Sequence, residues 1–287
     1  MDFGLSEQQR DVQNLAREIL SEQVTQEKLA QYDSYKAERF DRELWQQVAQ
    51  AGLLGVAVDE EYGGMGFGFF EAALIAEEVG RSIAPLPFIS HCISAALPIQ
   101  QFASSEQKQR LLPGAVSGET LLTAALMEAN NEDPSQPRDC RAERSGDGLR
   151  ISGEKLCVPF AKQAQHILLA AADGDAAVVV LLQPGSAGLE MAAMEVTNYE
   201  PQYRLSLDNV EVSADNIIAS GDAARALLKS LAEHTTAALC AHQLGASDKA
   251  MRMTASYTAE RQQFGVPIAT FQAVGHRAAN CFIDVEC

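Results

Sequence analysis

A corner between two predicted helices brings together side chains that could bind a phosphate group. Residues 261–272 read Arg-Gln-Gln-Phe-Gly-Val-Pro-Ile-Ala-Thr-Phe-Gln. The guanidinium of Arg261 can hold two phosphate oxygens at once, and the amides of Gln262 and Gln263 add hydrogen-bond donors. Phe264 adds an aromatic ring. The sequence therefore predicts a phosphate-binding corner. The plainer alternative makes Arg261 a solvated charge at a helix end and Phe264 a core residue.

The segments on either side must hold this corner in place. Residues 223–260 contain no proline and one glycine, Gly245, which favours a single long helix. Gly265 and Pro267 are expected to end that helix. Thr270 is expected to cap a second helix. Apolar residues recur at helical spacing in the first segment at Leu227, Leu228, Leu231, Ala238, Leu239 and Ala246, and in the second at Phe271, Val274 and Ala278.

Composition limits the classes of partner. The chain has 287 residues, enough for about two domains, and 47% of them are hydrophobic, as in a globular core. A formal net charge of −17 argues against nucleic acid, which requires a basic surface, and against an anionic membrane surface. No apolar run is long enough to span a bilayer. We therefore predict neither a nucleic-acid nor a membrane partner.

The termini, cysteines and histidines bear on localisation and metal binding. Residues 1–7 show neither the basic nor the apolar part of a secretion signal. The six cysteines form no CxxC pair and the histidines have no metal-site spacing, so we expect reduced thiols in the cytoplasm and no bound metal. Residues 282–287 end inside a helical pattern. This ending predicts a truncated chain that lacks C-terminal helices.

The chain divides into three parts with different patterns. Residues 1–118 carry helical periodicity, residues 119–220 carry strand patterns, and residues 221–287 are helical again. Ser6 and Gln9 form a capping box at the start of the first helix. This order predicts an α+β protein with an N-terminal helical domain, a middle β domain and a C-terminal helical bundle. Further helices are expected at about 43–52, 69–79, 89–102 and 105–112.

The middle part reads as a small antiparallel barrel or sandwich. One hairpin is predicted in residues 149–158, with its turn at Gly153. Residues 130–148 are polar and contain two prolines, which is typical of a surface loop. The remaining strands are expected at 121–126, 166–171, 176–182 and 203–212.

The corner is also part of a longer pattern. Residues 261–274 read Arg-x-x-Phe-Gly-x-Pro-Ile-x-x-Phe-Gln-Ala-Val and are followed by His276-Arg277. This run resembles the signature of the acyl-CoA dehydrogenases. The glycine-containing segment 52–66 and the segment 77–87 resemble the N-terminal helical domain of the same family, with Asp59 where proline is usual. The resemblance covers nearly the whole chain and matches the family's domain order.

The resemblance implies an activity. Members of the family use FAD to remove hydrogen from the α and β carbons of an acyl-CoA thioester, giving the trans-2-enoyl-CoA, and pass the electrons to an electron-transfer flavoprotein. The corner reaches across a subunit interface in that family. Arg261, Gln263 and Phe264 are therefore expected on the pyrophosphate or adenosine of a neighbour's FAD, with Gln272 close by. A homodimer, a homotetramer or a heteromer with a related subunit is expected.

The middle part departs from the family pattern where that pattern contacts flavin. The family's Glu-Pro-Gly-Ala-Gly-Ser-Asp becomes Glu-Ala-Asn-Asn-Glu-Asp at residues 128–133, and its Trp-Ile-Thr becomes Cys-Val-Pro at 157–159. The resemblance still places Leu126 and Met127 beside the isoalloxazine ring, together with the backbone of Val158 and Phe160. The alternative is that all four are core residues of strands.

The catalytic base is not located by the sequence. In most of the family the glutamate lies in C-terminal helices, beyond Cys287. A minority place it on the long helix, at a position that falls on Thr235 here. Glu233 is two residues away, roughly on the opposite helix face, and is the remaining candidate; a solvated surface charge is the default. Two alternatives follow: a catalytically silent subunit of a heteromer, or a flavin oxidase or monooxygenase.

Overall fold

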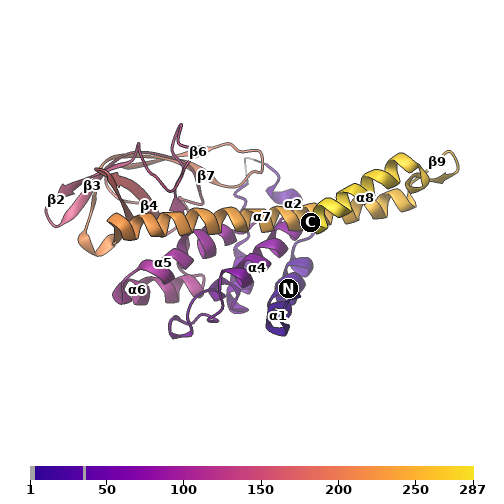
Figure 1. The fold of residues 1–287 in the computed structure, drawn as a ribbon, viewed down its shortest axis with the longest axis horizontal. Coiled ribbons are helices and arrows are strands. Elements are labelled where there is room, and N and C mark those ends of the chain that lie inside the picture. The colour runs from indigo at the N-terminus through magenta and orange to yellow at the C-terminus, as the bar shows by residue number, and fades with distance from the viewer. Residues whose placement is uncertain (1–3, 35–36) are drawn as a thin grey trace.

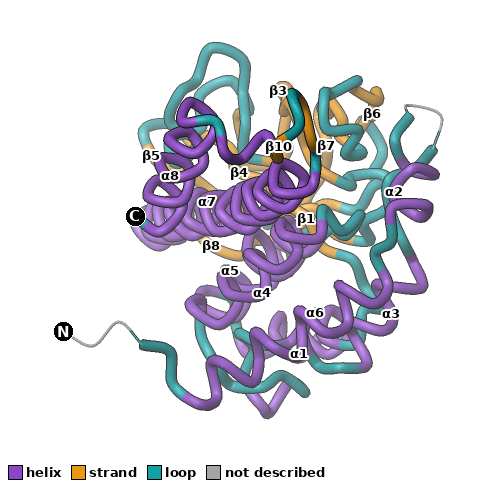
Figure 2. Tube along the Cα trace, turned by 90° about the vertical axis from the view of Figure 1, so that its right-hand side faces the viewer, coloured by secondary structure: helices purple, strands orange, loops and turns teal. Residues whose placement is uncertain are grey.

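The computed structural model describes residues 4–34 and 37–287; Met1–Phe3, part of the segment without a secretion signal, lie outside the described residues. The fold is α+β, as predicted. A long helix, α7 (Gly221–Glu260), runs past both a β-sheet and a group of N-terminal helices, and a second helix, α8 (Gln272–Glu286), folds back along its far half (Figure 1). Figure 2 shows the same arrangement end-on, with α7 near the centre.

The N-terminal part is helical, and the predicted capping box is present at its start. Ser6 Oγ accepts from the backbone N–H of Gln9 at 3.2 Å, and Gln9 Oε1 accepts from the N–H of Ser6 at 2.9 Å. A short helix at residues 26–32 was not predicted. The helices are α1 (Glu7–Gln23), α2 (Gln26–Tyr32), α3 (Arg42–Gln50), α4 (Phe69–Ser82), the π-helical segment η3 (Ile89–Ala96), α5 (Leu97–Phe102) and α6 (Ser105–Val116).

The β part is one eight-stranded mixed sheet in the order β6-β7-β3-β2-β4-β5-β8, with β1 paired to β4 off this path. The pairings of β1 and β2 with β4 are parallel, and the others are antiparallel. The strands are β1 (Leu122–Ala125), β2 (Arg141–Ser145), β3 (Gly148–Pro159), β4 (His166–Asp173), β5 (Ala176–Leu182), β6 (Leu189–Met194), β7 (Gln202–Val212) and β8 (Ile217–Ser220).

The predicted turn at Gly153 is wrong. Gly153 lies inside the continuous strand β3, at a register shift against β7, with φ +138°. A Cβ atom there would lie 2.6 Å from the carbonyl oxygen of Asp139, so the glycine admits a close approach of backbone instead of making a turn. The hairpin turn is between β2 and β3, and β2 itself occupies part of the segment predicted as a loop.

The predicted long helix is present as α7 (Gly221–Glu260), and α8 spans Gln272–Glu286. The helix end and the second cap differ from the prediction. α7 ends at Glu260, before Gly265, because Arg261 already has extended geometry (ψ 119°). Phe271, not Thr270, is the N-cap of α8; the Thr270 hydroxyl donates to the Pro267 carbonyl at 2.7 Å.

Two glycines allow α4 and α7 to cross in close contact. A Cβ atom on Gly80 would lie 1.9 Å from the carbonyl oxygen of His242, and one on Gly245 would lie 1.9 Å from that of Glu77. Arg81 on α4 joins the same contact through ion pairs with acidic side chains of both helices. This crossing fixes the direction in which α7 leaves the body of the molecule.

Among the described residues, one of the three buried apolar clusters lies along the first half of α7. Apolar side chains of α5, α6, the sheet and α7 up to Leu231 form one buried cluster, and the buried residues of α7 end at Asp248. No described residue of α8 is buried. The second half of α7 and all of α8 therefore form an arm that projects from the body (Figure 1). In the described chain, none of the helices has the length and apolar content needed to cross a bilayer.

Candidate functional site

The predicted corner is the tip of this arm. Strands β9 (Gln262–Gln263) and β10 (Val266–Pro267) pair antiparallel and are joined by the two-residue turn Phe264-Gly265. Arg261 anchors the tip at both ends, because its N–H donates to the Tyr257 carbonyl at 2.8 Å and its carbonyl accepts from the N–H of Ile268 at 2.8 Å. The tip is thus a small rigid hairpin and not a loose loop.

The hairpin displays the predicted residues outward. Arg261, Gln263 and Phe264 are exposed, and Gln272 is exposed at the start of α8. Phe264 is 94% exposed, although its ring packs edge-on against Phe271 with centroids 6.3 Å apart. The structure brings all four together at one end of the arm.

Phe264 also has an unfavourable backbone conformation. Its φ is +54°, and Gly265 follows with φ +78°, which are the angles of the tight hairpin turn that favours Asn-Gly. A left-handed conformation costs a bulky L-residue about 1–2 kcal/mol. The tip of the arm thus holds an exposed aromatic ring on a strained backbone, a combination that is common at functional sites.

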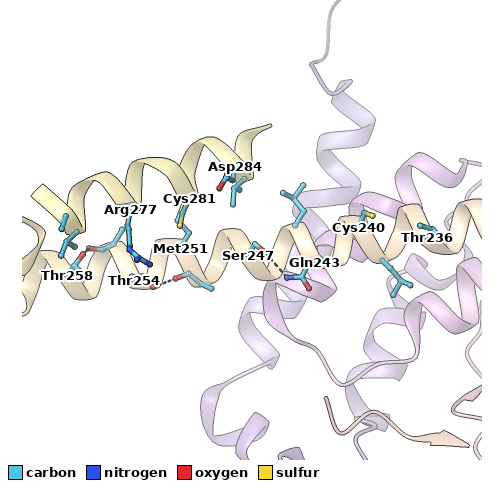
Figure 3. A pocket seen from close by; sticks show the side chains of 18 residues that line it. Thr236, Cys240, Gln243, Ser247, Met251, Thr254, Thr258, Arg277, Cys281 and Asp284 are labelled. Carbon is cyan, nitrogen blue, oxygen red and sulfur yellow. Dashed lines mark hydrogen bonds between the residues drawn. The ribbon is translucent and has the colours of Figure 1, made fainter. Parts of the chain in front are cut away.

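A groove of about 1130 Å³ runs between the two helices of the arm (Figure 3). Its walls are mostly apolar or small side chains. Of the 18 residues that line it, Arg277 and Asp284 are the charged ones. The α7 wall includes Thr236, Leu239, Cys240, Gln243, Leu244, Ser247 and Met251, and the α8 wall includes Ala273, Val274, Ala278 and Cys281.

The two positions considered for a base on α7 have different surroundings. Glu233 is exposed and lies 3.9 Å from the ammonium group of Lys229, outside the groove. Thr235 faces the body, where its hydroxyl lies 2.9 Å from that of Ser94 on η3. A carboxylate at position 233 is therefore in water and not in an enclosed pocket beside the groove.

The four residues predicted beside the flavin ring lie in or just after strands β1 and β3, and they differ in accessibility. Met127 is 45% exposed and Leu126 is half-buried, whereas Val158 and Phe160 are buried. The N–H of Phe160 donates to the Pro201 carbonyl at 2.7 Å, and its carbonyl accepts from two N–H groups of the following turn. A flavin contact by the backbone of Phe160 would have to replace these bonds. Met127 is the most accessible of the four.

One buried ion pair beside these residues was missed by the sequence reasoning. Glu128 and Lys155 have fully buried side chains, and their Oε1 and Nζ atoms are 2.7 Å apart. Burial opposes ionisation of Glu128, but hydrogen bonds from Lys155 and from backbone N–H groups outweigh it and lower its pKa to about 2. The sequence did contain a signal for this pair. Lys155 lies an even number of residues from the buried Leu149 and Ile151 on β3, so its side chain belongs to the same, inward face of the strand.

The two parts of the predicted flavin site lie on different parts of the chain. The corner is at the tip of the arm, away from the sheet that carries Met127 and Val158 (Figure 1). One chain therefore does not bring them together. Among the described residues, no group of three or more metal-binding side chains occurs.

Comparison with known proteins agrees with the resemblance. The family model of the acyl-CoA dehydrogenase N-terminal domain matches residues 6–119, and that of the C-terminal domain matches residues 225–287. The acyl-CoA dehydrogenase FadE27 of Mycobacterium tuberculosis is 33% identical over 286 residues, which cover 100% of this chain and 74% of FadE27. The chain thus spans about three-quarters of the length of this relative.

Solved structures give the same result. A variant of the Tcur3481–Tcur3483 steroid ACAD is 38% identical with a TM-score of 0.89, over 98% of this chain and 74% of the matched chain. The ChsE4–ChsE5 complex of Mycobacterium tuberculosis is 32% identical with a TM-score of 0.91, over 100% of this chain and 76% of the matched chain. This chain belongs to the acyl-CoA dehydrogenase family.

Proposed function

We propose that this chain is a subunit of an FAD-dependent acyl-CoA dehydrogenase, which converts an acyl-CoA thioester to the trans-2-enoyl-CoA and passes electrons to an electron-transfer flavoprotein. One observation carries the assignment to flavin: the strained, exposed Phe264 beside Arg261 at the tip of the arm. The tip needs a ligand from outside its own chain, and the pyrophosphate of a neighbour's FAD has the matching charge.

The side chains present fit this cofactor. No described residue pairs with the guanidinium of Arg261, which leaves its fork of N–H donors for two phosphate oxygens. Gln263 and Gln272 add amides, and Phe264 offers a ring face to an adenosine. On the sheet, Met127 offers an exposed apolar side chain to the ring system. When bound, FAD would supply the hydride acceptor.

The residues of this chain would bind and orient the cofactor and exclude water. The base that removes the α-proton is not assigned. Among the described carboxylates, burial raises the pKa values of Glu77 and Glu200, but Glu77 is bound to Arg81 and neither lines the groove of the arm. Glu233 is exposed to solvent. We infer that the base comes from residues other than these.

A heteromeric assembly with a silent subunit is the second candidate. Two observations favour it: the backbone of Phe160 is bonded within the chain, and the family's flavin-contacting Trp-Ile-Thr is replaced by Cys157-Val158-Pro159. The similar structures named for ChsE4–ChsE5 and Tcur3481–Tcur3483 are complexes of two named components. In this form the chain would lend its corner to a partner's flavin and hold none itself.

Purification and anaerobic titration separate these functions. An active dehydrogenase purifies yellow, and its flavin absorbance bleaches when an acyl-CoA is added without oxygen. A protein that is colourless alone, but raises the flavin content of a co-expressed related subunit, would identify the silent form. Peroxide release during turnover would instead indicate an oxidase, because a dehydrogenase passes its electrons to the flavoprotein acceptor. A yellow protein that no acyl-CoA bleaches would exclude the proposed reaction.

A further inference from the structure

The carboxylate of Glu128 is enclosed by hydrogen-bond donors from one short loop and one lysine. Lys155 Nζ donates to Oε1 at 2.7 Å. The backbone N–H groups of residues 138–140 donate to the two oxygens at 2.7, 3.0 and 3.1 Å. The amide of the buried Asn131 adds a fifth donor at 3.2 Å. A buried charge is stable only with such partners, so both the start and the end of the loop are held at one point.

The same pair connects the two segments assigned to flavin. Lys155 Nζ also donates to the Leu126 carbonyl at 3.3 Å. The next residue, Leu156, donates its N–H to the Met127 carbonyl at 2.9 Å. The exit of β1 and the middle of β3 are thereby joined beside the exposed Met127. The ion pair and this backbone hydrogen bond together hold the two segments beside each other.

The loop also packs against β3 where no side chain intervenes. A Cβ atom on Gly153 would lie 2.6 Å from both the Asp139 carbonyl oxygen and the Cα atom of Cys140. Asn130 takes φ +56°, so an asparagine provides the left-handed residue at the start of a loop in which the glycines of the family pattern are absent. The loop is therefore built by side-chain and backbone hydrogen bonds around Glu128 and not by a run of glycines.

We propose that Glu128 and Lys155 are positioning residues for flavin binding: their ion pair sets the separation of residues 126–127 and 156–158 before the cofactor arrives. This inference rests on the proposed function, because it takes the ligand of these segments to be FAD. A buried ion pair often adds little net stability compared with a neutral pair of similar shape. Its contribution here is to geometry, which lowers the cost of ordering the site on binding.

The test compares the wild type with Glu128→Gln/Lys155→Met, in which the charges are removed together so that no unpaired charge stays buried. Lys155→Arg is the conservative variant, and Val210→Ala, in the core of the sheet, is a control that weakens the same sheet without touching the pair. Each chain is purified in the oligomer that it forms. FAD affinity is measured by quenching of flavin fluorescence, flavin absorbance is recorded, and thermal unfolding is followed without FAD.

We expect the double variant to bind FAD at least about tenfold more weakly and with a shifted flavin absorbance, and Lys155→Arg to recover part of the affinity. Val210→Ala should lower Tm and keep the wild-type affinity. Wild-type affinity and absorbance in the double variant would overturn the inference, as would an equal loss of affinity in Val210→Ala. If the wild type itself binds no FAD, both the proposed cofactor and the inference are wrong. If the wild type binds FAD and the double variant binds it equally well, only the inference is wrong.

Discussion

At the scale of single residues, the site residues of this chain divide into two kinds. Arg261 and Phe264 are exposed and are held by backbone hydrogen bonds and turn geometry. Glu128 and Lys155 are buried and are held by each other. The first kind can contact a ligand directly, whereas the second can act on a ligand only through the segments that it fixes.

Arg261→Ala tests the first kind. A charge-assisted hydrogen bond to phosphate contributes about 1.5–3 kcal/mol, so the variant should bind FAD about 10- to 100-fold more weakly. Val266→Ala is the matched control, since Val266 is an exposed neighbour on the same hairpin and its side chain has no hydrogen-bond donor. Flavin-fluorescence titration of both variants gives the comparison. Equal affinities for the two would remove Arg261 from the site.

Glu128 should make the protein sensitive to acid. Its pKa is about 2 in the folded chain, below the ordinary value of 4.5, so the unfolded chain binds a proton at higher pH than the folded chain does. This carboxylate therefore contributes stability fully above about pH 5, and the contribution is lost as the pH falls toward 2. Urea unfolding between pH 7 and 3 measures the slope.

Glu128→Gln supplies the comparison for that slope. It has no carboxylate to protonate at position 128, so its unfolding free energy should fall less steeply below pH 5 than that of the wild type. The variant starts from a lower stability because the charge of Lys155 is left buried without its partner. Parallel pH dependences for the two proteins would show that Glu128 does not titrate in this range.

At the scale of elements, the crossing of α4 and α7 sets the position of the arm. Gly80→Ala and Gly245→Ala should each destabilise the fold by more than about 2 kcal/mol, because the new Cβ would lie 1.9 Å from a backbone oxygen of the other helix. Gly275→Ala in α8 is the control: its nearest atom would be 3.9 Å away, and alanine favours a helix by up to about 1 kcal/mol. Urea denaturation measures all three variants.

The sequence was sufficient for elements with long or regular patterns. The capping box of Ser6 and the unbroken stretch before Glu260 identified α1 and α7, because caps and helical periodicity are local properties. The strands β6 and β8 were missed because they are short strands at the two ends of the sheet order: β6 has no buried residue, and β8 has only four residues. A turn was predicted at Gly153 because the sequence alone does not distinguish a glycine in a turn from a glycine that leaves room for a neighbouring backbone segment.

The candidate site was predictable to a similar extent. The corner could be identified because its residues are contiguous between Arg261 and Gln272. The Glu128–Lys155 pair could not be identified as a contact, because the two residues are 27 positions apart and meet only when β1 and β3 are placed in one sheet. The exposure of the arm is a property of tertiary packing, and no local pattern encodes it.

At the scale of the whole molecule, the distance between the corner and the sheet predicts a shared site. If each flavin lies between the corner of one subunit and the sheet of another, Arg261→Ala and Glu128→Gln/Lys155→Met damage opposite halves. Random mixing in a homodimer gives one subunit of each kind in half of the molecules, and each of these has one intact site of two. Co-expression of the two variants should therefore recover about a quarter of the wild-type flavin content.

This mixing experiment has a clear contrary outcome. If the corner served the flavin of its own chain, each mixed dimer would contain two damaged sites and no flavin would be recovered. Each variant expressed alone provides the baseline, and a different affinity tag on each of the two variants shows, by purification on both tags in turn, that mixed dimers form. Flavin content per protein is measured from absorbance after denaturation.

The helix α7 also determines which changes of chain length the protein can accept. Its 40 residues extend about 60 Å without a break, and the crossing at Gly245 fixes one point along it. Inserting one residue between Gly245 and Arg261 would rotate the corner by about 100° and advance it by about 1.5 Å, so that the guanidinium would face away from its ligand. Inserting seven residues would nearly restore the direction but displace the corner by about 10 Å. Insertions and deletions in this segment should therefore abolish the site even when every side chain of the corner is retained.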